Sequence, residues 1–275
     1  MLKSQKMHGI TNDFLYAVGR VSSFFRNHKT GKETKLEGTG FYIKKNEKIF
    51  FITNSHVLDL KFSNPSDESI LANVTIDERK YKSTKNTVEV EQLSLSSINL
   101  RYAADSLDDI ACVFNIRVNK TINLNTIDYS MLANTNVIQH ELNVCDRVVS
   151  IGFPIYTYDH LNDNPVLRSG VISSDPRLCY SFNDKYIGHT MAYESYSTEG
   201  GSGSPIFACQ KGFKVGKGLT APSDFFRQVY LIGIQSKIVN LYKKMGENSI
   251  VKHQQMSILY KSDKIIELID MCDNL

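Results

Sequence analysis

The chain has 275 residues, 41% of them hydrophobic and 22% charged, which is the composition of an ordinary folded globular protein. Its net charge of +3 and the lack of any block of like charges give no reason to expect a nucleic-acid or anionic-membrane partner. No apolar run approaches the roughly 20 residues of a membrane helix, and the N-terminal segment lacks the apolar core of a secretion signal. We therefore expect a cytoplasmic protein.

The cysteines are odd in number and show no Cys-x-x-Cys spacing. The five residues are Cys112, Cys145, Cys179, Cys209 and Cys272. Cys112 and Cys209 stand inside apolar, strand-like runs. This pattern favours reduced and mostly buried thiols over a metal site or a disulfide framework, and we expect no cofactor.

Short runs rich in Val, Ile, Phe and Tyr recur along most of the chain, separated by Gly, Asn, Asp and Ser. They cover residues 41–43, 49–53, 88–90, 110–116, 147–151 and 229–234. Their length and composition are typical of β-strands, and little helical periodicity lies between them. The first two runs are joined by the polar segment KKNEK, which predicts a hairpin that ends just before His56. The sequence thus predicts a mostly β fold.

Three further segments organise the chain as a single domain with two lobes. Residues 61–99 are polar and predict loops and hairpins inserted between the elements of His56 and Asp109. Residues from about 118 to 141, rich in Asn and Thr, predict a linker between lobes at about 14–117 and about 142–260. Residues 262–272 begin with Ser262 as a cap and carry apolar residues at helical spacing, which predicts a C-terminal helix packed on the second lobe.

The segment GGSGSPIF places Ser202 between two glycines and is typical of a serine nucleophile on a tight turn. A serine hydroxyl is a poor nucleophile at neutral pH, so it needs a base within hydrogen-bonding reach and a third group to orient that base. His56 ends one apolar strand and Asp109 opens another. The chain order His, Asp, Ser differs from that of α/β-hydrolases, which place the serine first.

Each of these residues alone has a common structural explanation, but three apolar-flanked sites in one compatible order favour a catalytic triad. Two alternatives stay open. Asp108 competes with Asp109, which directly precedes the apolar run IACVF. Ser204 competes with Ser202, which has glycine on both sides.

The glycines beside the serine have a predicted task of their own. A tetrahedral intermediate carries an oxyanion, and backbone N–H groups converge on it only where side chains do not intrude. We expect Gly200 and Ser202 to supply these N–H groups, and Gly203 to let the chain turn away.

The motifs GTGFYI, TNSHV, DDIACVF, IGFP, SGVISS and GGSGSPIF together resemble the chymotrypsin-like (trypsin-fold) serine peptidases, in particular their bacterial branch. The resemblance spans residues 38–237. Within that branch, MAYESYSTEGGSGSPIF followed by LIGIQSK is most similar to the staphylococcal-type glutamyl endopeptidases.

The resemblance implies an all-β fold of two six-stranded antiparallel β-barrels, with the triad in the cleft between them and a helix at the C-terminus. It also implies that Tyr196, Ser197 and the strand Gln235-Ser236-Lys237 border the specificity pocket. Ser236 is expected near the triad carboxylate and the substrate backbone.

Two departures from the family pattern bear on activity. Glutamyl endopeptidases carry a His at the position of Gln235, so the usual partner of a substrate glutamate is missing here. Gly201 stands where animal digestive members have an Asp that pairs with a new N-terminus, so that form of activation is not expected.

The favoured hypothesis is a serine endopeptidase that makes limited cuts in intracellular protein or peptide substrates. One alternative is a catalytically silent, protease-like module that binds peptides. Another is a protease that becomes active only when a regulatory protein partner binds.

Overall fold

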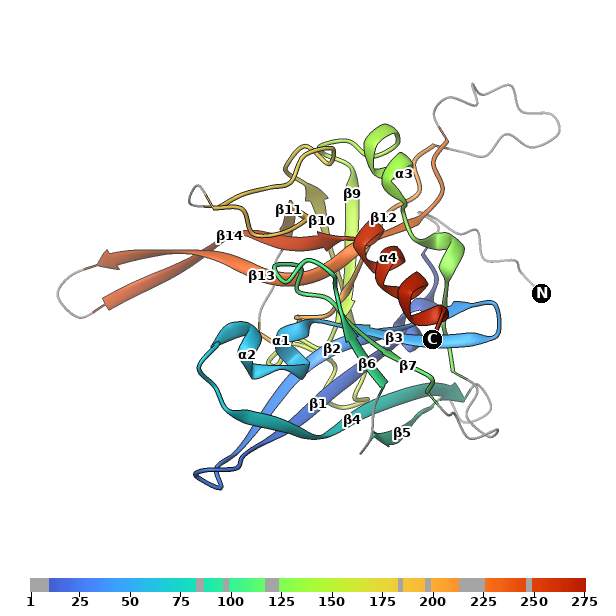
Figure 1. Ribbon diagram of the computed structural model, residues 1–275. Helices are drawn as coiled ribbons and strands as arrows, with labels where there is room; N and C mark the ends of the chain where they lie inside the picture. The colour runs from blue at the N-terminus through green and yellow to red at the C-terminus, as the bar shows by residue number, and fades with distance from the viewer. Residues whose placement is uncertain are drawn as a thin grey trace.

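The computed structural model describes residues 10–82, 87–95, 99–116, 124–182, 185–195, 199–212, 226–245 and 249–275. Two β lobes lie against each other, and a C-terminal helix packs beside both (Figure 1). The expected all-β, chymotrypsin-like fold with a C-terminal helix is confirmed.

The first lobe is an eight-stranded sheet in the order β5-β4-β1-β2-β3-β7-β6, with β8 added in parallel to β2. Its strands are β1 Val18–Asn27, β2 Glu33–Lys45, β3 Lys48–Thr53, β4 Ser69–Lys82, β5 Thr87–Leu95, β6 Asn99–Tyr102, β7 Ala111–Phe114 and β8 Ile127–Asp128. Short helices interrupt it: η2 Asn12–Ala17, α1 Ser55–Leu58, α2 Leu60–Ser63 and η3 Tyr129–Met131. The predicted hairpin before His56 is confirmed, because β2 and β3 pair antiparallel with Phe41 opposite Ile52.

The described strands of the first lobe form a hydrogen-bonded path with two ends. In the described residues its hydrogen-bonded path ends at β5 on one side and β6 on the other. These two ends are consecutive along the chain, because only residues 96–98, which lie outside the described residues, separate β5 from β6.

The second lobe is a closed barrel of six strands in the order β10-β11-β14-β13-β12-β9. The strands are β9 Arg147–Gly152, β10 Val166–Ile172, β11 Thr190–Ser195, β12 Pro205–Ala208, β13 Tyr230–Met245 and β14 Ser249–Lys261. Helix α3, Thr135–His140, precedes it, and helix α4, Ser262–Asp273, follows it. Closure satisfies the backbone hydrogen bonds that an open sheet would leave at its edges.

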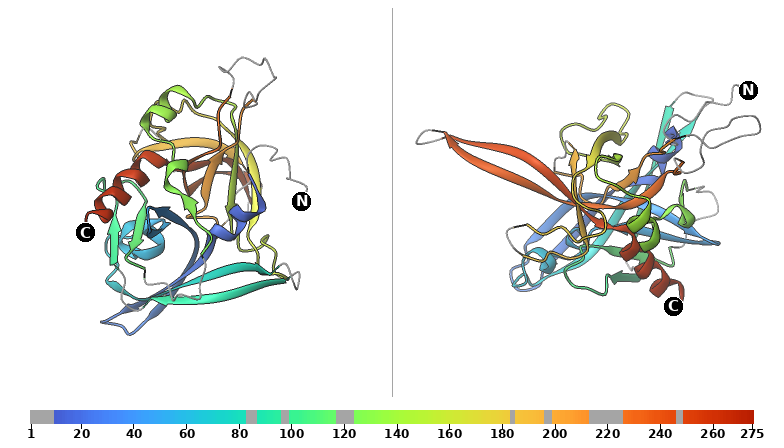
Figure 2. Two further views of the ribbon diagram at one scale, coloured as in Figure 1. Left: turned by 90° about the vertical axis from the view of Figure 1, so that its right-hand side faces the viewer. Right: turned by 90° about the horizontal axis from the view of Figure 1, so that it is seen from above.

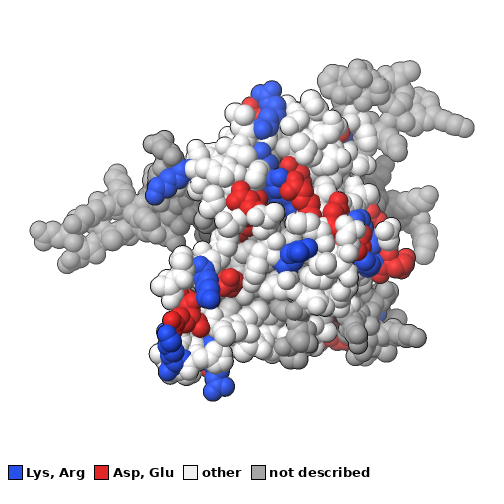
Figure 3. All heavy atoms as spheres, viewed as in Figure 1, with Lys and Arg blue, Asp and Glu red and all other residues white. Residues whose placement is uncertain are grey.

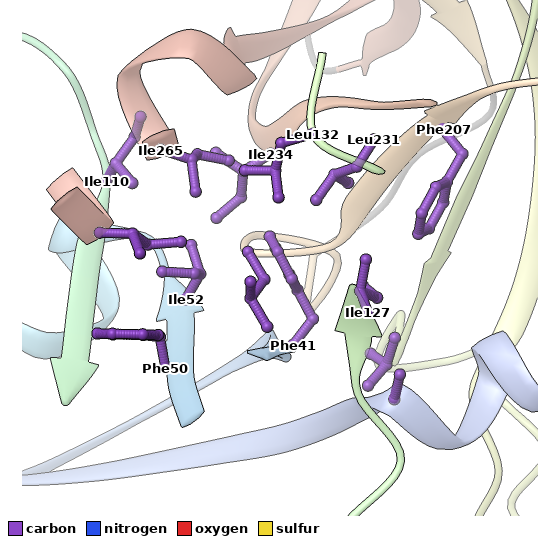
Figure 4. Packing of buried hydrophobic residues seen from close by; sticks show 14 of the residues in the cluster. Phe41, Phe50, Ile52, Ile110, Ile127, Leu132, Phe207, Leu231, Ile234 and Ile265 are labelled. Atoms are coloured by element: carbon purple, nitrogen blue, oxygen red, sulfur yellow. The ribbon is translucent and has the colours of Figure 1, made fainter. Parts of the chain in front are cut away.

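One hydrophobic cluster joins the two lobes and α4. Figure 4 shows Phe41 and Ile52 of the first lobe facing Ile234 of the second, with Ile265 of α4 beside Ile234. These four side chains are at most 1% exposed. Burying an Ile or Phe side chain stabilises a fold by about 1.5–3 kcal/mol, so this shared core holds the lobes in a defined relation.

The apolar residues of α4 recur at helical spacing and face that core. Ile265, Leu268, Ile269 and Cys272 are all buried. Spacings of three, four and seven residues place them on one side of the helix. The helix therefore covers the junction of both lobes rather than the second lobe alone.

The surface shown in Figure 3 carries Lys and Arg interspersed with Asp and Glu, without a large field of one sign. Within the described parts of the chain, no helix has the length and apolar character needed to cross a membrane. All five cysteines are unpaired, and Cys112, Cys209 and Cys272 are buried.

Candidate active site

The β2–β3 hairpin delivers His56 to the junction of the lobes. Helix α1 begins at Ser55, directly after β3 and Asn54, so His56 stands in its first turn. The His56 amide donates to Oδ1 of Asp109 at 3.0 Å, and its Nδ1 lies 2.6 Å from Oδ2 of the same carboxylate. Asp109 thereby holds His56 at both its backbone and its ring, and among the described residues Nε2 of His56 makes no hydrogen bond.

Asp109 is buried at the start of the strand region that leads into β7. Its side chain is 0% exposed, and Oδ2 also accepts a hydrogen bond from Ser236 Oγ at 2.5 Å. Burial alone raises the pKa of Asp109, but the hydrogen bonds from His56 and Ser236 outweigh burial and hold the pKa below its usual value. The carboxylate is therefore ionised at neutral pH.

The adjacent carboxylate faces the opposite way. Asp108 accepts from the amide of His189 at 2.7 Å and lies 2.9 Å from its Nδ1, the same two-point arrangement that Asp109 makes with His56. Burial raises the pKa of Asp108, although the hydrogen bonds from His189 oppose the shift. Of the two carboxylates left open by the sequence, Asp109 is thus the one that reaches His56.

Asp105, Asp108 and His189 have metal-ligating atoms within 4.8 Å of one another. The hydrogen bonds between Asp108 and His189 account for their approach. This group therefore acts as a polar contact between the first lobe and the segment before β11.

The serine turn requires glycine at two positions. Gly200 and Gly203 have φ angles of 85° and 90°, in the left-handed region that side chains disfavour. A Cβ on Gly200 would lie 2.5 Å from the Phe153 carbonyl oxygen. A Cβ on Gly203 would lie 1.8 Å from the Thr39 carbonyl oxygen. The backbone of the turn is therefore pressed against both lobes.

Thr39, which the sequence analysis did not single out, holds this turn from the first lobe. Its amide donates to the Ser202 carbonyl at 2.7 Å, and its Oγ1 donates to the Gly200 carbonyl at 2.9 Å. Thr39 is 0% exposed. Its position between two glycines in the GTG motif was the available signal, because flanking glycines permit a close backbone approach.

Two backbone amides of the serine turn, those of Gly200 and Ser202, are the predicted donors to an oxyanion. Among the residues that the structure describes, neither the Gly200 N–H nor the Ser202 N–H donates a hydrogen bond. Buried or half-buried amides are normally paired, so two unpaired donors beside a serine are suited to bind a developing oxyanion.

The Ser202 hydroxyl lies beside the groups that surround His56. It donates to the Ser236 carbonyl at 3.3 Å, and Ser236 in turn contacts Asp109. No hydrogen bond joins Ser202 to His56 in the described part of the chain. Serine rotamers exchange rapidly, and catalytic hydrogen bonds are often long or absent before substrate binds.

Ser204, the alternative nucleophile, is 2% exposed and lies one residue before β12. Its Oγ packs against Gly152, where an added Cβ would be 2.0 Å away. Ser202 is half-buried and so is the more accessible of the two hydroxyls.

Of the predicted pocket residues, Tyr196 and Ser197 lie outside the described residues, as does the side chain of Lys237. Gln235 is 3% exposed, and its Oε1 accepts from the Tyr193 hydroxyl at 2.8 Å. Burial raises the pKa of Tyr193, so this hydroxyl stays protonated and keeps the Gln235 amide in one orientation.

The glycine requirement is testable. Gly203→Ala is expected to lower the free energy of unfolding by about 3–5 kcal/mol, because backbone strain adds to steric overlap with Thr39. Gly31→Ala is the matched control, since Gly31 also has a positive φ, of 70°, but has no atom within 4 Å of an added Cβ. It should cost only about 1–2 kcal/mol. Urea unfolding measures both, and equal losses would contradict the packing described for the turn.

Comparison with known proteins places this site in context. A model of the trypsin-like peptidase domain matches residues 38–216, which include His56, Asp109 and Ser202. Among solved structures, the crystal structure of Deg5 is similar, with a TM-score of 0.50, 13% sequence identity, and coverage of 93% of this chain and 88% of that chain. At this identity the likeness shows the fold alone. Comparison with curated proteins gave no match. Because the family model covers more than half of the chain, the chain belongs to the trypsin-like peptidase domain family.

Proposed function

We propose that this chain is a serine endopeptidase that cleaves peptide bonds through an acyl-enzyme on Ser202. The observation that carries the proposal is the continuous set of contacts from His56 to Asp109, from Asp109 to Ser236 and from Ser236 to Ser202. These contacts bring an imidazole, a buried carboxylate and a half-buried hydroxyl to one place at the junction of the lobes.

The reaction follows the roles of these groups. Ser202 Oγ bonds to the scissile carbonyl carbon while its proton passes to Nε2 of His56, and Asp109 stabilises the imidazolium. The Gly200 and Ser202 amides bind the oxyanion. Collapse of the intermediate breaks the C–N bond, and His56 returns the proton to the leaving amine. Water then attacks the acyl-enzyme by the same route and releases the acid.

The proposal also includes a preference for the substrate residue before the scissile bond. The likeness to staphylococcal-type glutamyl endopeptidases favours a polar residue before the scissile bond. Gln235 in place of the His of that group supports an uncharged or weakly held polar side chain rather than strict selection of glutamate. Limited proteolysis of intracellular proteins stays a prediction from the sequence.

A second candidate is activation by a partner protein. The observation that favours it is the Ser202 hydroxyl, which donates to the Ser236 carbonyl rather than to His56. In that case, binding of the partner would turn the hydroxyl toward the imidazole.

One experiment tests both candidates on the isolated protein. A fluorophosphonate probe reacts only with an activated serine, and peptide mass spectrometry locates the adduct. We expect labelling at Ser202 and digestion of unfolded casein without any added protein. Labelling at another residue would contradict the proposed nucleophile. No labelling of folded protein would favour the partner-activated or the catalytically silent module.

A further inference from the structure

The β13–β14 hairpin continues past the second barrel as a two-stranded ribbon. Its pairs run from Gly233 opposite Lys261 in the barrel to Met245 opposite Ser249 near the tip. Figure 1 shows the ribbon leaving the body of the molecule beyond every other labelled element, and the right-hand view of Figure 2 shows the same. At about 3.3 Å per residue, residues 237–245 span about 26 Å along the ribbon.

Along this ribbon, β14 is the only described strand that pairs with β13. Strand β12 pairs with β13 only as far as Pro205 opposite Ile234. The Gln235 amide then donates to the Ser204 carbonyl, and the Gln235 carbonyl accepts from the Gly203 amide. From residue 237 to residue 245, β14 covers one edge of β13 and no described strand pairs with the other. Such an edge is a template for an added strand.

This edge of β13 starts at the candidate nucleophile. The β13–β14 register shifts between Gln235 and Lys237, which marks a bulge at Ser236. Bulges re-aim backbone groups, and here the Ser236 carbonyl meets the Ser202 hydroxyl at 3.3 Å. A peptide whose scissile carbonyl lies against Ser202 must pass beside Ser236. From Ser236 the edge of β13 runs only toward residue 245, so it faces substrate residues on one side of the scissile bond.

We propose that the edge of β13 over residues 239–245, past the barrel and past the positions next to Ser236, is an extended recognition surface for the substrate, which adds to the ribbon as a third strand. The inference rests on the proposed peptidase function and concerns substrate residues on one side of the scissile bond, well beyond those at Ser236. The occupant is an extended or unfolded protein segment. Pairing through backbone groups demands an extended chain more than a particular sequence. Continuity with the Ser202 site favours the substrate over a second copy of the chain.

The test uses synthetic peptides that span a casein bond cleaved by the protein. One peptide has four residues on each side of the bond, a second has ten before it, and a third has ten after it. A shortened variant joins Ile238 to Ser257, which face each other, through an Asn-Gly turn in place of residues 239–256. For the native chain, one of the two longer peptides should have a kcat/KM about tenfold above that of the short peptide. The other longer peptide should have nearly the same kcat/KM as the short one.

The shortened variant should cleave the short peptide at the native rate and show no gain with length. A gain that survives shortening, or no gain in the native chain, overturns the proposal. A second measurement needs no variant. Single N-methyl groups along the longer peptide should reduce cleavage by the native chain at alternate residues, because alternate N–H groups of a strand face one neighbour. Losses without this alternation overturn the proposal.

The outcomes also separate this inference from the proposed function. Cleavage of the short peptide that disappears in Ser202→Ala, together with no length effect, sinks the ribbon proposal alone. Failure of the native chain to cleave any peptide sinks both. A third outcome is that the native chain is a dimer, the shortened variant is a monomer, and peptide length does not change kcat/KM. That outcome assigns the edge to a second copy of the chain.

Discussion

Replacing Ser202 by alanine is expected to lower kcat by about 10⁶-fold on any cleavable peptide, because it removes the attacking oxygen of the proposed mechanism. The turn itself is held by backbone contacts, including the bond from the Thr39 amide to the residue 202 carbonyl. The variant should therefore fold with nearly native stability. Initial rates on a fluorogenic casein-derived peptide, with thermal unfolding as the check on folding, measure the effect.

Ser204→Ala is the matched control, since it removes the neighbouring hydroxyl of the same motif. Ser204 is buried against Gly152, and among the described residues its Oγ has no hydrogen bond with His56, Asp109 or Ser202, so we expect the rate to stay within about tenfold of native. The opposite result, a silent Ser204→Ala and an active Ser202→Ala, would transfer the nucleophile to Ser204.

The second large effect concerns the paired carboxylates. Asp109→Asn is expected to lower kcat by about 10⁴-fold. Its Oδ2 accepts from Nδ1 of His56, which fixes the tautomer whose Nε2 takes the serine proton. An amide in its place favours the wrong tautomer and leaves the imidazolium without a negative partner. Because the pKa of Asp109 is held below its usual value, the native carboxylate stays ionised across the neutral range.

Asp108→Asn makes the same chemical change one residue earlier and serves as its control. Asp108 contacts His189 rather than His56, so we expect a loss of activity below about tenfold and a modest loss of stability. Steady-state kinetics and urea unfolding of the two variants are measured side by side. A larger loss of kcat in Asp108→Asn than in Asp109→Asn would reverse the assignment.

Several features could be predicted because their signals are local. The β2–β3 hairpin follows from two apolar runs around a polar turn, and α4 from apolar residues at helical spacing after Ser262. Gly200 and Gly203 were recognisable because only glycine takes their backbone angles beside a serine. These signals depend on neighbours within a few residues.

The long strands β4, β13 and β14 were harder to predict. Their strand character comes partly from pairing with residues far along the chain, as between Tyr193 of β11 and Ser257 of β14. Hairpins were predicted within residues 61–99, and β4 and β5 form one there, but polar residues hid the length of its strands because exposed strand faces tolerate polar side chains.

By itself the sequence determined the fold class, the family motifs and the three residue types suited to acyl transfer, because each depends on composition and short spacing. Only the tertiary structure decided that Asp109 rather than Asp108 meets His56, that Thr39 holds the serine turn, and that β13 continues as a ribbon with one edge that no described strand covers. These features arise where segments more than 50 residues apart meet, or where a strand lacks a neighbour. Such relations are set by the packing of the whole chain, which no local pattern encodes.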